Sequence, residues 1–84
     1  MNTMTELAEP HVEFELDVRG LNCPLPILRT KKALSALESG QTLRVQVTDP
    51  GALIDFPSFA RHSANVIVSQ TENDGVYEFV IRRR

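Results

Sequence analysis

Apolar and polar residues alternate with a period of two in four segments of this 84-residue chain. Such alternation is typical of strands that bury one face and expose the other. It predicts strands at Phe14–Val18, Thr42–Thr48, Val66–Thr71 and Val76–Ile81. The last two strands flank Glu72–Gly75, whose residues tolerate the positive φ angles of a hairpin turn. We therefore expect an antiparallel hairpin at the end of the chain.

The segment 27–39 has instead the three- and four-residue spacing of an amphipathic helix. Gly40 follows it and is a residue type that commonly ends helices. Pro24 and Pro26 fall in the predicted first turn, where a missing N–H breaks no intrahelical hydrogen bond. The two prolines thus indicate where the helix starts.

A second helical region runs from about residue 52 to 62. It contains Pro57, which is tolerated best in a first turn. We therefore predict a short turn at Pro50–Ile54, Asp55 as the N-cap, and the helix proper from Phe56.

The predicted order of elements is β-α-β-α-β-β. A strand, a helix and a strand favour a parallel pair joined by a right-handed crossover. The fold class is therefore α/β (α+β type): a two-layer sandwich of a four-stranded mixed sheet with two helices on one face. We expect residues 1–13 to form a disordered tail and residues 14–84 a single domain. An added edge strand near Val12 is the alternative for the tail.

The net charge of −2 restricts the functions that the chain can have. Phosphate binding needs a basic excess, so no direct nucleic-acid contact is expected, although Arg82–Arg84 could attract an acidic partner or RNA. No apolar run approaches the roughly 20 residues of a membrane span, and the N-terminus has no secretory signal. One cysteine and no signal favour a reducing cytoplasm. We expect a cytoplasmic monomer.

Cys23 is the sole cysteine and lies at the predicted start of the first helix. Partial positive charge at a helix N-terminus stabilises a thiolate, so we predict a lowered pKa for Cys23. The residue also follows the first strand, and Asp49 follows the second. Parallel strands would bring both to the sheet edge where α/β folds usually place ligands. A buried, inert thiol is the alternative.

The sequence excludes several kinds of thiol chemistry. There is no Cys-x-x-Cys pair, so any disulfide or sulfur relay needs the thiol of a partner. Cys23, His11 and His62 are too few soft ligands for a closed zinc site, and no Gly-rich phosphate loop is present. We expect no bound metal or cofactor. His62 lies near the end of the second helix, where a capping role is favoured over a role as a base for Cys23.

Charged residues near Cys23 have both a functional and a structural interpretation. Asp17 and Arg19 flank its loop, and one of them could orient it, or the two could form a structural pair. Asp49 suits a turn or cap better than acid catalysis. Three cations of the first helix form either a solvated face or a docking patch: Arg29, Lys31 and Lys32.

The stretch Leu16–Pro26 reads Asp-x-Arg-Gly-Leu-x before Cys-Pro-x-Pro. It resembles the signature of the TusA family, also called SirA-like sulfur carrier proteins. The resemblance continues through Ile27–Leu34 and Asp49-Pro50-Gly51, and covers residues 14–81. It implies a βαβαββ sandwich whose cysteine accepts sulfane sulfur as a persulfide and passes it to an acceptor protein. The implied donor is a cysteine desulfurase or a rhodanese.

On this resemblance the sulfur-carrying residue is Cys23, the motif prolines are Pro24 and Pro26, and the family's Asp is Asp17. Many members have Gly-His in the loop after the second helix, where this chain has Ser63-Ala64-Asn65. The endpoint stays open among tRNA thiolation, sulfur oxidation and molybdenum cofactor enzymes. Whether such a carrier counts as an enzyme also stays open, and a non-enzymatic regulatory or docking module is the alternative.

Overall fold

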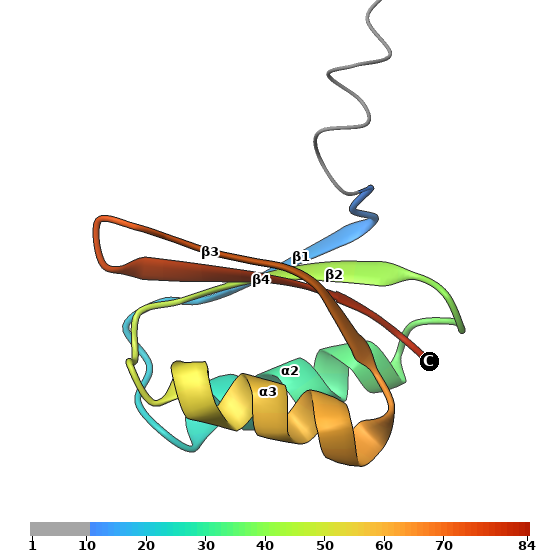
Figure 1. Cartoon of the computed structure of the whole chain (residues 1–84), viewed down its shortest axis with the longest axis horizontal. Coiled ribbons are helices and arrows are strands. Elements are labelled where there is room, and N and C mark those ends of the chain that lie inside the picture. The colour runs from blue at the N-terminus through green and yellow to red at the C-terminus, as the bar shows by residue number, and fades with distance from the viewer. Residues whose placement is uncertain (1–10) are drawn as a thin grey trace, which may run out of the picture.

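The computed structural model describes residues 11–84. Two helices lie side by side under one face of a four-stranded sheet (Figure 1). The elements are β1 (Phe14–Val18), α2 (Leu25–Ser35), β2 (Thr42–Val47), α3 (Ala52–Ser63), β3 (Val66–Asn73) and β4 (Val76–Arg82). The predicted βαβαββ two-layer sandwich is confirmed.

The sheet has the strand order β1-β2-β4-β3. β1 and β2 are parallel, with Phe14 opposite Leu43. β2 and β4 are antiparallel, with Val45 opposite Phe79, and β3 pairs antiparallel with β4. The parallel pair brings the carboxyl ends of β1 and β2 to one edge of the sheet, and the loops that follow them meet there.

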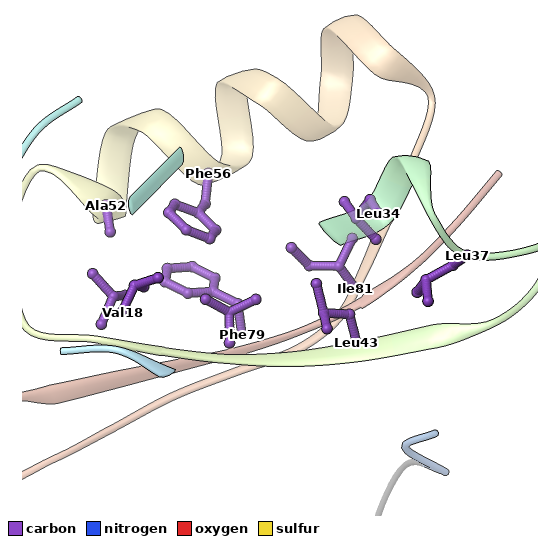
Figure 2. Close-up of a cluster of buried hydrophobic side chains, with 10 residues drawn as sticks. Val18, Leu34, Leu37, Leu43, Ala52, Phe56, Phe79 and Ile81 are labelled. Carbon is purple, nitrogen blue, oxygen red and sulfur yellow. The ribbon is translucent and has the colours of Figure 1, made fainter. Parts of the chain in front are cut away.

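The core lies between the sheet and the two helices (Figure 2). Phe56 of α3 stacks on Phe79 of β4 with ring centroids 4.5 Å apart, and both side chains are fully buried. Burying a side chain of this size stabilises the fold by roughly 1.5–3 kcal/mol. This contact fixes the first turns of α3 against the sheet and so determines where Asp55 lies.

The helix α2 starts at the two prolines, as the sequence pattern predicts, and ends earlier than predicted. It begins at Leu25, with Pro24 in the N-cap position and Pro26 in the first turn. It ends at Ser35 instead of residue 39. The N–H of Leu37 donates to the carbonyl of Leu34 at 3.0 Å, a three-residue spacing that tightens the chain after the last turn.

The start predicted for α3 is wrong. The helix begins at Ala52, four residues before Phe56, so Asp55 lies in its first turn and Pro57 lies inside it. The reason is Asp49, whose carbonyl oxygen accepts the N–H of Ala52 at 3.0 Å. Gly51 takes the N-cap position that the sequence pattern assigned to Asp55, and Asp49 forms the turn before it.

The hairpin is tighter than predicted. Its turn consists of Asp74 and Gly75, both with positive φ (53° and 80°), the geometry that matches the twist of flanking strands. The strands β3 and β4 are correspondingly longer than the alternation alone indicates.

Residues 1–10, the greater part of the predicted tail, lie outside the described residues. Val12 belongs to no strand. The Thr42 hydroxyl donates to the His11 carbonyl at 2.7 Å, and the Glu13 N–H donates to the Thr42 carbonyl at 3.4 Å. Neither helix within residues 11–84 is long and apolar enough to cross a membrane.

Candidate functional site

Cys23 is exposed in the loop between β1 and α2. Its backbone N–H donates to Oδ2 of Asp49 at 2.9 Å, and the N–H of Gly20 donates to Oγ1 of Thr48 at 2.9 Å. The loop that follows β2 therefore holds the loop that follows β1. The two sites that the sequence placed at one sheet edge, Cys23 and Asp49, are in direct contact.

The Sγ atom of Cys23 lies 3.6 Å from Oδ2 of Asp55, the distance of a thiol donating to a carboxylate. Asp55 comes from the first turn of α3, 32 residues further along the chain. Sequence reasoning did not include Asp55 in the site. The contact depends on how α3 packs beside α2, and residue spacing carries no signal of that packing.

The pKa of the Cys23 thiol is raised from its ordinary value, so the predicted lowering is wrong. The largest cause is loss of water around the sulfur, since neighbouring residues shield it even though the side chain is exposed overall. The hydrogen bond to Asp55 and the negative charges of Asp55 and Asp49 act in the same direction. Each of them favours the neutral thiol over the thiolate.

A shallow pocket of about 300 Å³ surrounds the sulfur. Its lining residues are Cys23, Pro24, Ile27, Lys31, Asp55, Ser58 and Phe59. The Nζ atom of Lys31 lies over the Phe59 ring, 5.7 Å from the ring centroid, within the range of a cation–π contact. The pocket thus holds one thiol, one carboxylate and one ammonium group.

The three cations of α2 do not form one patch. Lys31 lines the thiol pocket, whereas Arg29 and Lys32 line a separate concavity with Leu25 and Leu28. The single docking face proposed from the sequence is therefore divided between two sides of the helix.

Large apolar side chains are exposed on the first turns of both helices, close in sequence to Cys23 and Asp55. They are Leu25, Leu28, Leu53 and Ile54. Ile54 is 75% exposed, the largest fraction among them. Leu25 and Leu28 line the concavity of Arg29 and Lys32, and an exposed apolar surface of this kind is typical of a protein-binding site.

Asp17 and Arg19 bind each other. Two side-chain hydrogen bonds of 2.9 Å join them, and the Arg19 N–H donates to Asp17 at 3.0 Å. The hydrogen bonds from Arg19 lower the pKa of Asp17 to about 2. Among the hydrogen bonds of residues 11–84, none connects this pair with Cys23. The geometry favours the structural interpretation of the pair.

His62, which the sequence offered as a base for Cys23, takes no part in the site. Nδ1 of His62 lies 2.7 Å from the Ser58 carbonyl in its own helix, at the end of α3 away from Cys23. Residues 11–84 contain no group of three or more His, Cys, Asp or Glu side chains that could hold a metal ion.

The fold and the site together define a class of protein: a small two-layer α/β domain that presents one thiol at the carboxyl edge of its sheet. The family model described as Sulfurtransferase TusA matches residues 14–83. The chain belongs to this family, and the resemblance in its sequence is confirmed.

Relatives and a solved structure agree with the family. The chain is 51% identical over 69 residues to the sulfur carrier protein TusA of Allochromatium vinosum, covering 82% of this chain and 91% of that protein. It is 43% identical over 68 residues to the putative sulfur carrier protein YrkI of Bacillus subtilis, covering 81% and 91%. The crystal structure of a SirA-like protein from Desulfitobacterium hafniense superposes with a TM-score of 0.75 at 30% identity, covering 83% and 96%. These relatives support a role as a sulfur carrier.

Proposed function

We propose that Cys23 accepts sulfane sulfur as a persulfide from a donor protein and passes it to an acceptor protein. The observation that carries this proposal is the exposed thiol itself, whose N–H is held by Asp49 and whose Sγ faces Asp55 in a shallow pocket. A shallow pocket leaves the sulfur open to attack by a thiolate from a second protein. Residues 14–84 form the carrier in this proposal, and 1–13 the tail.

Sulfur transfer at Cys23 is an exchange without net oxidation or reduction. The Cys23 thiolate attacks the outer sulfur of the donor's persulfide, so a new S–S bond forms on Cys23. The donor's own S–S bond breaks, and its cysteine leaves with the electron pair and takes up the proton that Cys23 gives up. Onward transfer repeats the exchange, with the acceptor's thiolate as nucleophile and Cys23 as leaving group.

The two carboxylates beside the sulfur favour release of the cargo. A persulfide is more acidic than a thiol and is anionic at neutral pH, so Asp49 and Asp55 oppose its charge. Once the sulfur has been passed on, Cys23 is again a neutral thiol and donates to Asp55. The site therefore destabilises the loaded state relative to the unloaded one, which suits a carrier better than a store.

Partners complete the site in this proposal. The exposed Leu53 and Ile54, next in sequence to Asp55, and Leu25 and Leu28, which line the concavity of Arg29 and Lys32, supply apolar contact area. A cysteine desulfurase or rhodanese serves as donor in a reducing cytoplasm, where the carrier acts as a monomer without cofactor or direct nucleic-acid contact. Transfer RNA thiolation, sulfur oxidation and cofactor biosynthesis are the candidate endpoints, and Arg29 and Lys32 are docking candidates on the side away from the thiol pocket.

Intact-protein mass after incubation with a cysteine desulfurase and cysteine tests the proposal. The mass should rise by one sulfur atom and return to its starting value with reductant, and Cys23→Ser should abolish the change. A matched control, Cys23→Ser combined with Ser39→Cys, places an exposed thiol in the turn after α2, outside the thiol pocket. Sulfur delivery by Cys23→Ser, or equally fast loading of the relocated thiol, would contradict the proposal.

A further inference from the structure

A second concavity lies next to the thiol pocket, between α2 and α3. Its volume is about 390 Å³. Its lining residues are Lys31, Leu34, Ser35, Phe59, Ser63, Asn65, Arg83 and Arg84. Lys31 and Phe59 line both cavities, so the two are adjacent, and we name them together the interhelix groove. Its lining runs from Cys23 and Pro24 to Arg83 and Arg84, and the C-terminus of the chain lies near the C-terminal turns of the two helices (Figure 1).

The interhelix groove has opposite charges at its two ends. Asp55 lines the thiol end, and Asp49 lies close by. Lys31 lies midway, and Arg83 and Arg84 line the far end. The lining of that far part, among residues 11–84, includes no Asp or Glu. An occupant of matching charge is therefore neutral or basic beside Cys23 and acidic further along.

The cations at the far end are held in place by the fold. The Arg83 guanidinium donates to the carbonyl of Leu37, and the backbone N–H of Arg83 donates to the carbonyl of Gln41 at 2.8 Å. The N–H of Arg84 donates to Oδ1 of Asn65 at 2.9 Å. These bonds fix the segment across the end of the groove, which is how a preformed binding surface is built.

The length of the groove sets the length of chain that fits it. α2 has 11 residues, so at the usual rise per residue it is about 15 Å long. An extended chain advances about 3.3 Å per residue and covers that length in about four or five residues. If an extended partner segment places its own cysteine at Cys23, the side chains about three to five residues away from that cysteine therefore lie beside Lys31 and Arg84.

We propose that the interhelix groove binds an extended segment of a partner protein in which a cysteine is followed or preceded by acidic residues at that distance. The segment's thiol meets Cys23, and its carboxylates pair with Lys31, Arg83 and Arg84. The purpose of the segment's cysteine, to give or receive sulfur, rests on the proposed function. Single-stranded RNA fits less well, because its evenly spaced phosphates would pass Asp55.

Disulfide exchange with short peptides tests the groove without any natural partner. The probes are Cys-Gly-Ser-Glu-Glu-Glu and Cys-Gly-Ser-Gln-Gln-Gln, together with both reversed sequences, each activated as a thiopyridyl disulfide. The Cys23 thiolate attacks the peptide sulfur, a mixed disulfide forms, and thiopyridone leaves and is followed by its absorbance. In at least one chain direction the Glu peptide should react roughly tenfold faster than the Gln peptide at low salt, because opposite charges steer association. High salt should remove the advantage.

A pair of charge-reversed variants locates the effect. Lys31→Glu with Arg84→Glu should abolish the preference for the Glu peptide. Arg61→Glu with Arg82→Glu changes the net charge equally, but Arg61 is exposed on α3 and Arg82 is exposed on β4, both outside the groove lining. This control should keep the preference. If circular dichroism shows that the variant with Lys31→Glu and Arg84→Glu does not fold, Lys31→Gln with Arg84→Gln replaces it.

Three results would overturn the groove proposal. The first is equal rates for the Glu and Gln peptides in both chain directions, and the second is an equal loss of the preference for the Glu peptide in both double variants. The third is single-stranded RNA that slows the reaction of the activated Glu peptide as strongly as the unactivated Glu peptide does. Sulfur loading by the desulfurase, measured on the same samples, separates the two proposals. Loading without a peptide preference refutes the groove alone. A peptide preference without loading refutes the proposed function alone.

Discussion

The two ends of α2 are surrounded by opposite charges that come from distant parts of the chain. Asp49 and Asp55 lie at its N-terminal end, where Asp49 accepts the N–H of Cys23. Arg83 lies at its C-terminal end, where its guanidinium donates to the Leu37 carbonyl. Anions suit a helix N-terminus and cations suit a C-terminus, so both ends of the helix dipole are matched by side chains from other elements.

The comparison explains part of the raised pKa of Cys23, whose largest cause is loss of water around the sulfur. A helix N-terminus favours a thiolate only if that field is left unmatched, and here two carboxylates already match it. The same kind of charge matching thus has different consequences at the two ends. At the C-terminal end it stabilises the fold, and at the N-terminal end it also keeps the reactive thiol neutral.

Removing the charge of Asp55 should give the largest change. With Asp55→Asn the pKa of Cys23 should fall, because one cause of its raised value is gone. Alkylation by iodoacetamide at neutral pH should then be severalfold faster, since the rate follows the thiolate fraction. The measurement is the alkylation rate against pH, whose midpoint should move to lower pH.

Asp74→Asn is the control for this prediction. Asp74 is exposed in the hairpin turn with a φ of 53°, which Asn adopts readily. Its alkylation profile should match that of the unmodified protein. An unchanged midpoint in Asp55→Asn would show that Asp55 does not raise the pKa, which would then come from loss of water around the sulfur and from Asp49.

At the other end of α2, Arg83→Ala should lower stability and leave the thiol unaffected. The substitution removes the hydrogen bond to the Leu37 carbonyl, with an expected loss of about 1 kcal/mol in the free energy of unfolding. Thermal unfolding followed by circular dichroism should show a lower Tm, by about 4–8 °C for each kcal/mol in a domain of this size. Arg82→Ala, at an exposed position, should change the Tm little. An altered alkylation midpoint in Arg83→Ala would mean that the two ends are not independent.

Patterns in the sequence predicted the elements and their arrangement well, because each depends on local spacing. The alternation that located β2 and the turn residues before β4 are read directly from neighbouring positions. The contact between Cys23 and Asp49 also followed from the sequence, since parallel strands bring their carboxyl ends together.

The contact between Cys23 and Asp55 could not be predicted in the same way. It depends on the packing of α3 beside α2 and on the sheet, where Phe56 of α3 stacks on Phe79 of β4. The error in the pKa of Cys23 has the same origin, because the local pattern shows the helix start and not the carboxylate that packs beside it. Electrostatics near Cys23 is thus a property of the tertiary structure.

The smallest effect is expected at Asp17, the third carboxylate near this edge of the sheet. Its pKa of about 2 lies below the usual value because Arg19 binds the charged form. A carboxylate with a lowered pKa stabilises the folded state above its unfolded pKa of about 3.9, and that contribution is lost as the pH falls toward 2. Asp17→Asn should therefore lower the Tm slightly at neutral pH, and the difference should vanish in acid. Both side chains are exposed, so the loss should be smaller than in Arg83→Ala.

The alkylation profile of Asp17→Asn then decides between the two interpretations of the Asp17–Arg19 pair. The hydrogen bonds of the pair join its own members, so the midpoint for Cys23 should stay where it is. Glu15→Gln, which removes another exposed carboxylate of β1, is the matched control and should behave alike. A midpoint that moves in Asp17→Asn and not in Glu15→Gln would show that the pair orients the loop of Cys23. The charge at the N-terminal end of α2 would then include a third carboxylate besides Asp49 and Asp55.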